Sequence, residues 1–413
     1  MKKYVFFASS ICNMGGQEQY LNNKSKRLLA DGFDVYVFSY VNGNVLLNGL
    51  KRFKSCINPV LRLEPYLYWR RDVEKCLSWI ENVVKPNEDD IYVESTVAPQ
   101  AEWGELFSER VGARHIIIDL QEQHKYSQGL RSFLKFKYDR RELFGITKKS
   151  ILQILGSECN DEVARQSYID AECGGVIQEV DDPIIDRFES REINIGSIGR
   201  LDKPYVIPMI KDIVAFANTY CDKSIGLLLI GGGSKEIERF IQSEIGKARN
   251  ISLVITGYLC PIPEKLVRKI DCFICTAGSA YETMRYGSPT IVYSMSSYKP
   301  LGIFDYTIED ITQENVNVCL KIQDLLEQIL FKNFCNTHQP LGMRENDIDF
   351  EKEYRRQISF FASIAERQYY DVSKIIVFGA KEHLYKMVSF IVGAKYFEKL
   401  QRKMGMFRKK IKV

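Results

Sequence analysis

The sequence predicts an α/β fold in which two successive regions each build a parallel sheet covered by helices. Its 413 residues suit two domains. Short, continuously apolar runs alternate with amphipathic helical segments, as in parallel sheets that are buried on both faces. The alternation restarts after a polar stretch near Val180, which indicates a second sheet.

In the first region, the apolar runs predict strands over 3–9, 33–40, 90–96, 114–120 and 150–157. The first run is short and contains Tyr4, so we interpret it as a strand and not as a signal peptide. A helix is expected over 15–32, where Gly32 would end it. Its inward side chains would be Tyr20, Leu21, Leu28 and Leu29.

The second region follows a linker at 180–192 that contains a proline. Strands are expected over 193–200, 226–232, 251–258 and 272–277, and helices over 206–220, 234–248 and 262–270. Two such sheets facing each other would form a cleft at the carboxyl ends of their strands, where open α/β sheets bind ligands.

Composition excludes several classes of protein. The net charge of +4 gives no global signal for binding polyanions, so no nucleic-acid partner is expected. No apolar run approaches 18 residues, so no transmembrane helix is evident. Cys272 and Cys275 have metal-ligand spacing, but an offset of three on a strand places them on opposite faces. The cysteines fit buried thiols in a reducing compartment.

The stretch "CTAGSAYETMRYGSPTIV", which begins at Cys275, predicts an anion site. The small residues Gly278, Ser279 and Ala280 would let a phosphate approach the backbone N–H groups at a helix N-terminus. Glu282, in the first turn, could accept hydrogen bonds from sugar hydroxyls. An ordinary strand-to-helix joint, with Ser279 as the N-cap, would explain the same residues.

Five segments of the sequence occur in the same order as in one family of enzymes. "NMGGQEQYLNNKSKRLLADGFDVYVFS", "IGRLDK", "LLLIGGGSKEIERF", "ISLVITGYL" and "YETMRYGSPTIV" follow one another as in the GT-B glycosyltransferases, and the chain resembles their retaining family 4 group over roughly residues 1–370. The resemblance implies two Rossmann-like domains facing across a cleft. An acceptor-side domain would span 1–185 and a nucleotide-sugar-binding domain 190–345, with a helix near 351–371 that crosses back to the first domain.

The resemblance also implies the donor site. Arg200 and Lys203 match the basic pair that holds the donor diphosphate, and their charge would stabilise the leaving group. Gly15 and Gly16 match the loop that approaches the phosphates and the reacting sugar. The backbone at Gly257 and Tyr258 would flank the base, Gly278 to Ala280 would supply phosphate-binding amides, and Glu282 matches a ribose ligand.

One departure from the family concerns the donor sugar. The family has a second glutamate eight residues before the position of Glu282, where this sequence has Ile274 within a strand. The contact that this glutamate makes with the sugar is therefore absent or is replaced, with Ser279 as the candidate. The departure also weakens the assignment to the retaining group.

On the acceptor side, the polar segment after the fourth strand offers Asp119, Glu122 and His124 as catalytic candidates. Histidine carries protons near neutral pH, and a carboxylate could orient it or act itself. In this family the leaving phosphate itself can take the acceptor proton, so no protein nucleophile is expected. No metal or other cofactor is expected either, because Arg200, Lys203 and the helix dipole would stabilise the diphosphate. His115, His338 and His383 have no supporting cluster in the sequence.

The C-terminal region, 372–413, is expected to be a helical basic tail. Residues 395–413 contain eight Lys and Arg and one Glu. Tyr396, Leu400, Met404, Phe407 and Ile411 recur at steps of three and four, so the segment could lie on an anionic membrane surface. A helix packed on the first domain would explain the same spacing.

The sequence therefore favours a glycosyltransferase that moves a sugar from a nucleotide-diphosphate donor to a lipid-linked or growing glycan, in bacterial surface-polysaccharide biosynthesis. The enzyme would be cytoplasmic and peripheral at the inner face of the membrane. A nucleotide-sugar epimerase of the same fold is one alternative. A non-catalytic partner subunit is another, because a carboxylate is missing at position 274.

Overall fold

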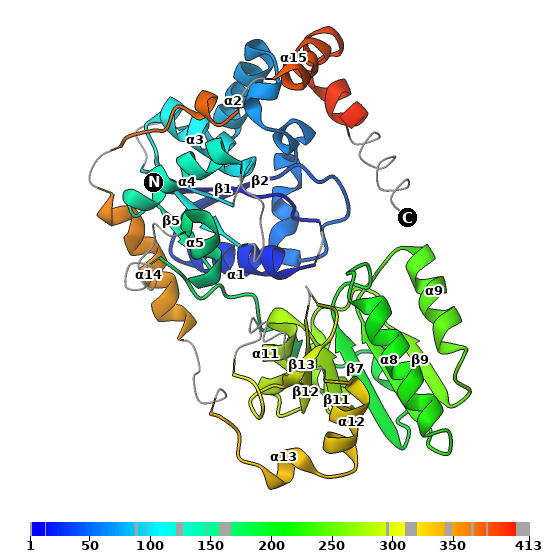
Figure 1. The fold of residues 1–413 in the computed structure, drawn as a ribbon. Helices are drawn as coiled ribbons and strands as arrows, with labels where there is room; N and C mark the ends of the chain where they lie inside the picture. Colours follow the sequence, from blue (N-terminus) through cyan, green and yellow to red (C-terminus); the bar gives the residue numbers. More distant parts are fainter. Residues whose placement is uncertain are drawn as a thin grey trace. The chain divides into compact units, whose positions relative to one another are not determined.

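The computed structural model describes residues 2–12, 14–86, 90–96, 98–120, 127–146, 148–156, 167–294, 297–309, 320–342, 349–364, 367–376 and 379–401. The chain forms two compact units, each with its own sheet (Figure 1). Unit 1 comprises residues 1–173 and 348–413, and unit 2 comprises residues 174–347.

Unit 1 is built on a five-stranded sheet with the order β2-β1-β3-β4-β5, in which every neighbouring pair is parallel. Its strands are β1 (Lys3–Phe7), β2 (Asp34–Phe38), β3 (Ile91–Ser95), β4 (Arg114–Asp119) and β5 (Leu143–Gly145). The alternation of side chains along β1 explains its continuously apolar sequence. Tyr4 and Phe6 enter one buried cluster, while Val5 and Phe7 enter another on the opposite face.

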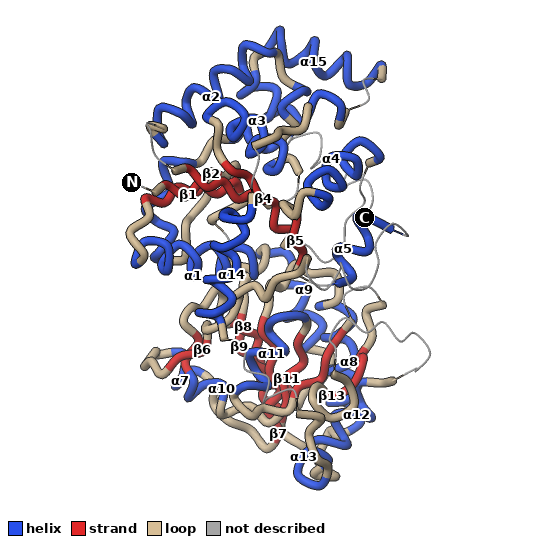
Figure 2. The backbone as a smooth tube through the Cα atoms, turned by 90° about the vertical axis from the view of Figure 1, so that its left-hand side faces the viewer, coloured by secondary structure: helices blue, strands red, loops and turns tan. Residues whose placement is uncertain are grey.

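Helices cover both faces of this sheet (Figure 2). They are α1 (Gly16–Ala30), α2 (Arg70–Val84), α3 (Gln100–Val111), α4 (Gln128–Asp139), α5 (Lys148–Leu155), α14 (Phe350–Ser363) and α15 (Ala380–Val392). Short 3₁₀ helices are η1 (Asn48–Cys56), η2 (Pro59–Arg62), η3 (Pro65–Leu67) and η6 (Val372–Lys374). Helix α1 agrees with the prediction, since Tyr20, Leu21 and Leu28 are buried and Gly32 follows the helix with a φ of +80°.

The strand predicted over 150–157 is wrong. Residues Lys148–Leu155 form helix α5, and the fifth strand is the shorter β5 before it. Ile151, Ile154 and Leu155 are buried at a spacing of three and four, which is the helical period. The apolar run was too short for its composition to separate a strand from a helix.

Unit 2 is built on a six-stranded sheet with the order β13-β12-β11-β7-β8-β9. Its strands are β7 (Ile193–Ile198), β8 (Ile225–Ile230), β9 (Ile251–Ile255), β11 (Cys272–Cys275), β12 (Thr290–Tyr293) and β13 (Pro300–Ile303). All neighbours are parallel except β12 and β13, which are antiparallel. The predicted α/β class, with a mainly parallel sheet in each half, is confirmed.

The helices of unit 2 lie around this sheet (Figure 1). They are α7 (Ile184–Arg187), α8 (Val206–Thr219), α9 (Lys235–Ile245), α10 (Glu264–Val267), α11 (Ala277–Arg285), α12 (Ile322–Leu330) and α13 (Phe334–Thr337). Strand β8 shows how the core is divided, because Leu227 and Leu229 join one buried cluster and Leu228 and Ile230 join the other.

The stretch 174–185, which the sequence assigned to the first domain, lies in unit 2. Its strand β6 (Ile177–Gln178) pairs with β10 (Ile262–Pro263). The hydroxyl of Tyr286, which follows α11, donates to the Ile177 carbonyl at 2.8 Å. Because of these contacts, unit 2 begins before the polar segment 180–192 that the sequence predicted as the linker.

Unit 1 also contains the C-terminal part of the chain. Gln357 of α14 contacts a buried group formed by Lys24, Glu94 and Tyr20, with its Oε1 at 2.8 Å from the Lys24 ammonium. Beyond α15, residues 394–401 are helical, and Phe397 is buried in the unit 1 core. In the part of the chain that the structure describes, no helix combines the length and apolar character required to cross a bilayer.

Candidate donor site at the carboxyl edge of the unit 2 sheet

Most of the predicted donor residues lie at one edge of the unit 2 sheet. Strands β11, β7, β8 and β9 are consecutive and parallel, so their carboxyl ends meet at the same edge. The loops that follow them carry Arg200, the glycines 231–233, Tyr258 and the start of α11. This is the edge at which open α/β sheets bind ligands.

Arg200 and Lys203 occupy the turn that follows β7. The turn is anchored by Leu201, whose N–H donates to the Gly232 carbonyl at 3.1 Å. The Arg200 Nε lies 3.6 Å from the Asp202 carboxylate, and the arginine side chain is 36% exposed. The guanidinium therefore faces solvent beside a neighbouring carboxylate, which an incoming phosphate would have to displace or outweigh.

Gly257 and Tyr258 follow β9. Gly257 has a φ of +71°, a backbone conformation that side chains rarely adopt. The Tyr258 ring packs on Gly232, where an added Cβ would lie 2.6 Å from a ring carbon. Tyr258 is nevertheless 44% exposed, so one part of the ring is available to a flat ligand.

Helix α11 begins earlier than the sequence suggested. Its first residue is Ala277, which has a φ of +48°, and the preceding Thr276 is extended. Ser279 therefore lies inside the first turn and does not act as the N-cap, and its Oγ donates to the Thr276 carbonyl at 2.7 Å. The Thr276 hydroxyl lies 3.3 Å from the Tyr205 hydroxyl, which links α11 to the Arg200 turn.

Gly278 leaves the first turn of α11 open. Among the described residues, no atom beyond its chain neighbours and the backbone of its own helix lies within 4 Å of a Cβ placed on Gly278, while Ala280 is fully buried. A helix N-terminus carries free N–H groups and a partial positive charge. An anion could therefore approach this backbone from the side of Gly278.

Glu282 lies in the second turn of α11 and not in the first, because the helix starts at Ala277. It is 6% exposed. Its two carboxylate oxygens lie 3.1 and 3.2 Å from the Gly175 nitrogen, which donates to them. A Cβ at Gly174 would lie 2.1 Å from the same carboxylate, so a side chain there would require Glu282 to move. The Arg285 guanidinium is 3.9 Å away.

Position 274 is confirmed as an interior strand residue. Ile274 is fully buried in an apolar cluster on one face of the sheet. Cys272 joins the same cluster and Cys275 the cluster on the opposite face, as the sequence predicted. Burial raises the pKa of the Cys275 thiol to about 11, which keeps it protonated. Within the described residues, no group of three or more His, Cys, Asp and Glu side chains could hold a metal ion.

In unit 1, Gly15 and Gly16 lie at the N-terminus of α1. The Gly15 N–H donates to the Glu18 carboxylate at 3.1 Å, and Gly16 is exposed. Glu18 thus places a negative charge where an anion would otherwise bind. Asp119 is the last residue of β4 and is fully buried. Glu122 and His124, the other predicted catalytic residues, lie outside the described residues.

His115 does have a supporting cluster, contrary to the prediction. Its Nδ1 lies 2.5 Å from the Glu105 carboxylate and its Nε2 lies 2.9 Å from the Ser95 hydroxyl. Glu105 also pairs with Lys137 at 2.6 Å. These side chains come from β3, α3, β4 and α4, so their proximity could not be read from sequence spacing. All of them are buried, so we assign them a structural role.

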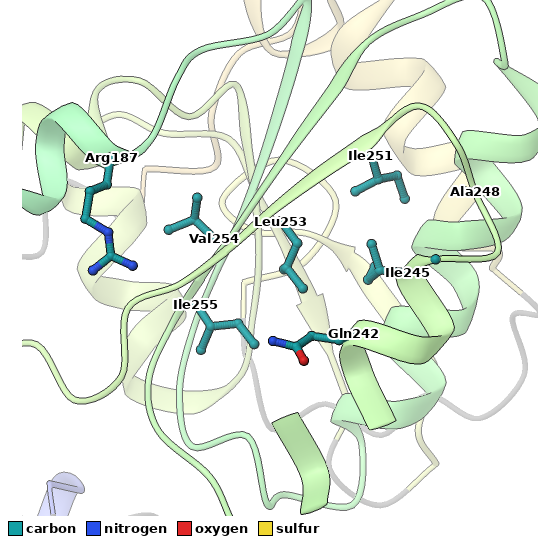
Figure 3. Close-up of a pocket in the computed structure, with 9 residues that line it drawn as sticks. Arg187, Gln242, Ile245, Ala248, Ile251, Leu253, Val254 and Ile255 are labelled. Atoms are coloured by element: carbon teal, nitrogen blue, oxygen red, sulfur yellow. The ribbon is translucent and has the colours of Figure 1, made fainter. Parts of the chain in front are cut away.

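A hollow of about 530 Å³ lies beside the edge strand β9 (Figure 3). It is lined by apolar side chains of β9, among them Leu253 and Ile255, and by Gln242 and Ile245 of α9. Arg187 reaches it from α7. The hollow runs along the side of the sheet and is separate from the loops that carry Arg200 and Gly278.

No protein-family model matches the sequence, and no curated protein matches it. Solved structures do match over most of the chain. A mutant of TarM from S. aureus, in complex with fondaparinux, α-GlcNAc-glycerol and UDP, has a TM-score of 0.56 at 11% identity, covering 87% of this chain and 99% of that one. A glycosyltransferase from Rickettsia africae has a TM-score of 0.56 at 11% identity, covering 89% and 99%.

A further match is a trehalose-6-phosphate protein from E. coli bound to UDP-2-fluoro glucose, with a TM-score of 0.52 at 12% identity, covering 87% of this chain and 99% of that one. At such identities the likeness concerns the fold alone. These proteins have the GT-B fold, which confirms the predicted fold class of two Rossmann-like units.

Proposed function

We propose that the protein is a glycosyltransferase that moves a sugar from a nucleotide-diphosphate donor to a lipid-linked or growing glycan acceptor. The observation that carries the proposal is the carboxyl edge of the unit 2 sheet. There a basic turn, an exposed tyrosine and the N-terminus of α11 follow the parallel strands β7, β9 and β11 of a GT-B fold. The ordered sequence motifs add the likeness to the retaining family 4 group and to surface-polysaccharide synthesis in bacteria.

The diphosphate of the donor would bind between the Arg200 turn and α11. Arg200 and Lys203 would stabilise the negative charge that grows on the leaving group. The backbone amides at Gly278, Ser279 and Ala280 would contribute the partial charge of the helix N-terminus. These groups belong to the protein, so the proposal includes no cofactor and no metal.

The nucleoside would extend from α11 toward the other end of this edge, which follows β9. Gly257 and Tyr258 would flank the base, since the Tyr258 ring is partly exposed. Glu282 would accept hydrogen bonds from the ribose. A carboxylate has about four acceptor sites, and Gly175 supplies one N–H, so Glu282 keeps capacity for a ligand.

The acceptor side of the reaction would belong to unit 1. Gly15 and Gly16 would approach the donor phosphates and sugar, which requires the Glu18 carboxylate to leave the Gly15 N–H. Glu122 and His124 would orient the acceptor or carry its proton, and the buried Asp119 would act through them. Residues 395–413 would hold the enzyme at the inner, anionic face of the membrane. The exposed side chains of Tyr396 and Leu400 support that placement, whereas the buried Phe397 packs on the domain.

The test is release of nucleoside diphosphate from a panel of nucleotide sugars, with lipid-diphosphate-linked glycans as acceptors. Arg200→Ala should abolish acceptor-dependent release. Arg249→Ala, an exposed arginine before β9 at the opposite edge of the same sheet, should leave it intact. Conversion of the nucleotide sugar without acceptor would indicate an epimerase instead. Binding without turnover would indicate a partner subunit.

A further inference from the structure

Helix α15 carries apolar side chains on two faces, and one of them packs on unit 1. Tyr385 and Val388 contact the same buried cluster as Val73 of α2. The hydroxyl of Ser389 donates to the Leu67 carbonyl at 3.2 Å. The helix lies beside α2 in both views of the fold (Figure 1 and Figure 2). Its position is therefore fixed by the core of unit 1.

The other face of α15 is apolar and open. Leu384, Met387 and Ile391 lie at steps of three and four, which places them on one stripe, and they are 58%, 62% and 76% exposed. Phe390, which is 54% exposed, contacts the ring of Trp69 with 4.7 Å between centroids. We call Trp69, Leu384, Met387, Phe390 and Ile391 the α15 apolar face. Side chains of this size rarely gather on a surface without a partner.

Exposed cations lie close in sequence to the residues of the α15 apolar face. Arg70 and Arg71 follow Trp69 and are exposed, as are Lys381, Lys395 and Lys399. Of the nearby carboxylates, Glu398 pairs with Arg62 at 3.0 Å. Glu382, which accepts from the Gly379 N–H at 3.1 Å, and Asp72, which follows Arg71, also lie near this rim. The five cations outnumber these carboxylates, so the rim carries a net positive charge.

We propose that the α15 apolar face and its basic rim bind an anionic lipid bilayer, with Trp69 at the level of the headgroups. Apolar side chains would enter the upper part of the bilayer while the cations contact lipid phosphates. A second copy of the same face is disfavoured, because it would bring the two basic rims together. The proposal concerns the folded surface of α15 and α2, separate from residues 402–413, and does not depend on the donor site.

The experiment uses the full chain and vesicles of phosphatidylcholine with and without phosphatidylglycerol. Trp69 is exposed, Trp79 is partly buried and Trp103 is fully buried, so a change in tryptophan emission that is lost in Trp69→Phe reports on Trp69. The emission should shift to shorter wavelength with anionic vesicles and be quenched by brominated lipid. Both effects should weaken in high salt.

The substitutions Met387→Glu and Ile391→Glu together should weaken vesicle binding more than about tenfold, since two exposed apolar side chains would no longer enter the bilayer. Phe240→Glu, at a 38% exposed position on α9 of unit 2, is the matched control and should change nothing. Circular dichroism and thermal unfolding would verify that each variant is folded.

Several results would overturn the proposal. One is an unchanged emission of the wild-type protein, which needs no variant. Another is vesicle binding that survives both glutamates and is lost when residues 402–413 are removed, which would place the contact in that segment. A third is a dimer in sedimentation experiments that the glutamates dissociate, without vesicle binding, which would identify a second copy as the partner.

Discussion

The Glu282 carboxylate accepts a hydrogen bond from the Gly175 N–H, with its two oxygens 3.1 and 3.2 Å from that nitrogen. Gly175 lies at the start of unit 2, and Glu282 lies on α11 at the carboxyl edge of the sheet. Glu282, which matches a ribose ligand, thus also binds the backbone of the first residues of unit 2. A change at Glu282 should affect both stability and nucleotide binding.

Glu282→Ala should lower the free energy of unfolding by about 1–3 kcal/mol, because it leaves a backbone donor without its charged acceptor. Glu282→Gln keeps an oxygen for the Gly175 N–H and should cost about 1 kcal/mol or less. Urea unfolding measures both. Nucleotide binding should weaken in both variants, so the glutamine variant separates ligand binding from folding. Equal stability of the two variants would contradict this role of the carboxylate.

Gly278→Ala should weaken binding of a nucleoside diphosphate about tenfold while leaving the fold intact. The new methyl group meets open space in the protein, and alanine is the better helix former by up to about 1 kcal/mol. The methyl group would lie where the phosphate is proposed to approach. Titration calorimetry and thermal unfolding test the two halves of this prediction. Unchanged affinity would place the phosphate elsewhere.

Asp202→Asn should tighten binding of the nucleoside diphosphate, because the Asp202 carboxylate lies 3.6 Å from the Arg200 Nε and competes with a phosphate. Both side chains are partly exposed, so the gain should not exceed about fivefold. It should shrink in high salt. Weaker binding in the variant would mean that Asp202 orients Arg200 instead of competing for it.

The free energy of unfolding should fall as the pH drops below about 6.5. Burial, together with the charge of Lys137, lowers the pKa of His115 from 6.5 to about 4. Between these values the unfolded chain binds a proton that the folded protein does not. The stabilisation is therefore complete above pH 6.5 and declines toward pH 4, by at most about 1.4 kcal/mol per pH unit.

Glu105 adds to this loss at lower pH. Burial alone would raise its pKa, but the charge of Lys137 and the hydrogen bond with His115 outweigh it and lower the pKa from 4.5 to about 2. Its contribution is complete above pH 4.5 and is lost toward pH 2. Urea unfolding at several pH values should show that His115→Gln flattens the slope between pH 6.5 and 4.5. His338→Gln, at an exposed position, should retain that slope.

The sequence predicted the class of fold because each strand of a buried parallel sheet reads as an apolar run. The prediction of a strand at Ile151 to Leu155 was wrong because the apolar run is short. A short run of buried residues does not distinguish the two-residue period of a strand from the 3.6-residue period of a helix. The start of α11 was misplaced because Ala277 adopts a positive φ that is unusual for alanine. That shift moved Ser279 from the cap into the first turn and Glu282 into the second.

The sequence also located the basic turn and the α11 segment that meet at one sheet edge, because motif order implies strand order in this fold. It could not show that Glu282 contacts Gly175, since that bond joins residues 107 positions apart. The buried group around His115 was missed for the same reason. Its members are spread over four elements, and only tertiary packing brings them together.

The measurement that tests the central claim most directly is nucleotide binding to the wild-type protein and to Arg200→Ala, with Arg249→Ala as the control. Thermal unfolding would be followed with UDP, GDP, ADP, CMP and their sugar conjugates. One nucleotide at a hundred times its Kd should stabilise the wild-type and control proteins by about 2.7 kcal/mol, and Arg200→Ala should lose that gain. Equal stabilisation of all three proteins, or of none, would contradict a donor site at the carboxyl edge of the unit 2 sheet.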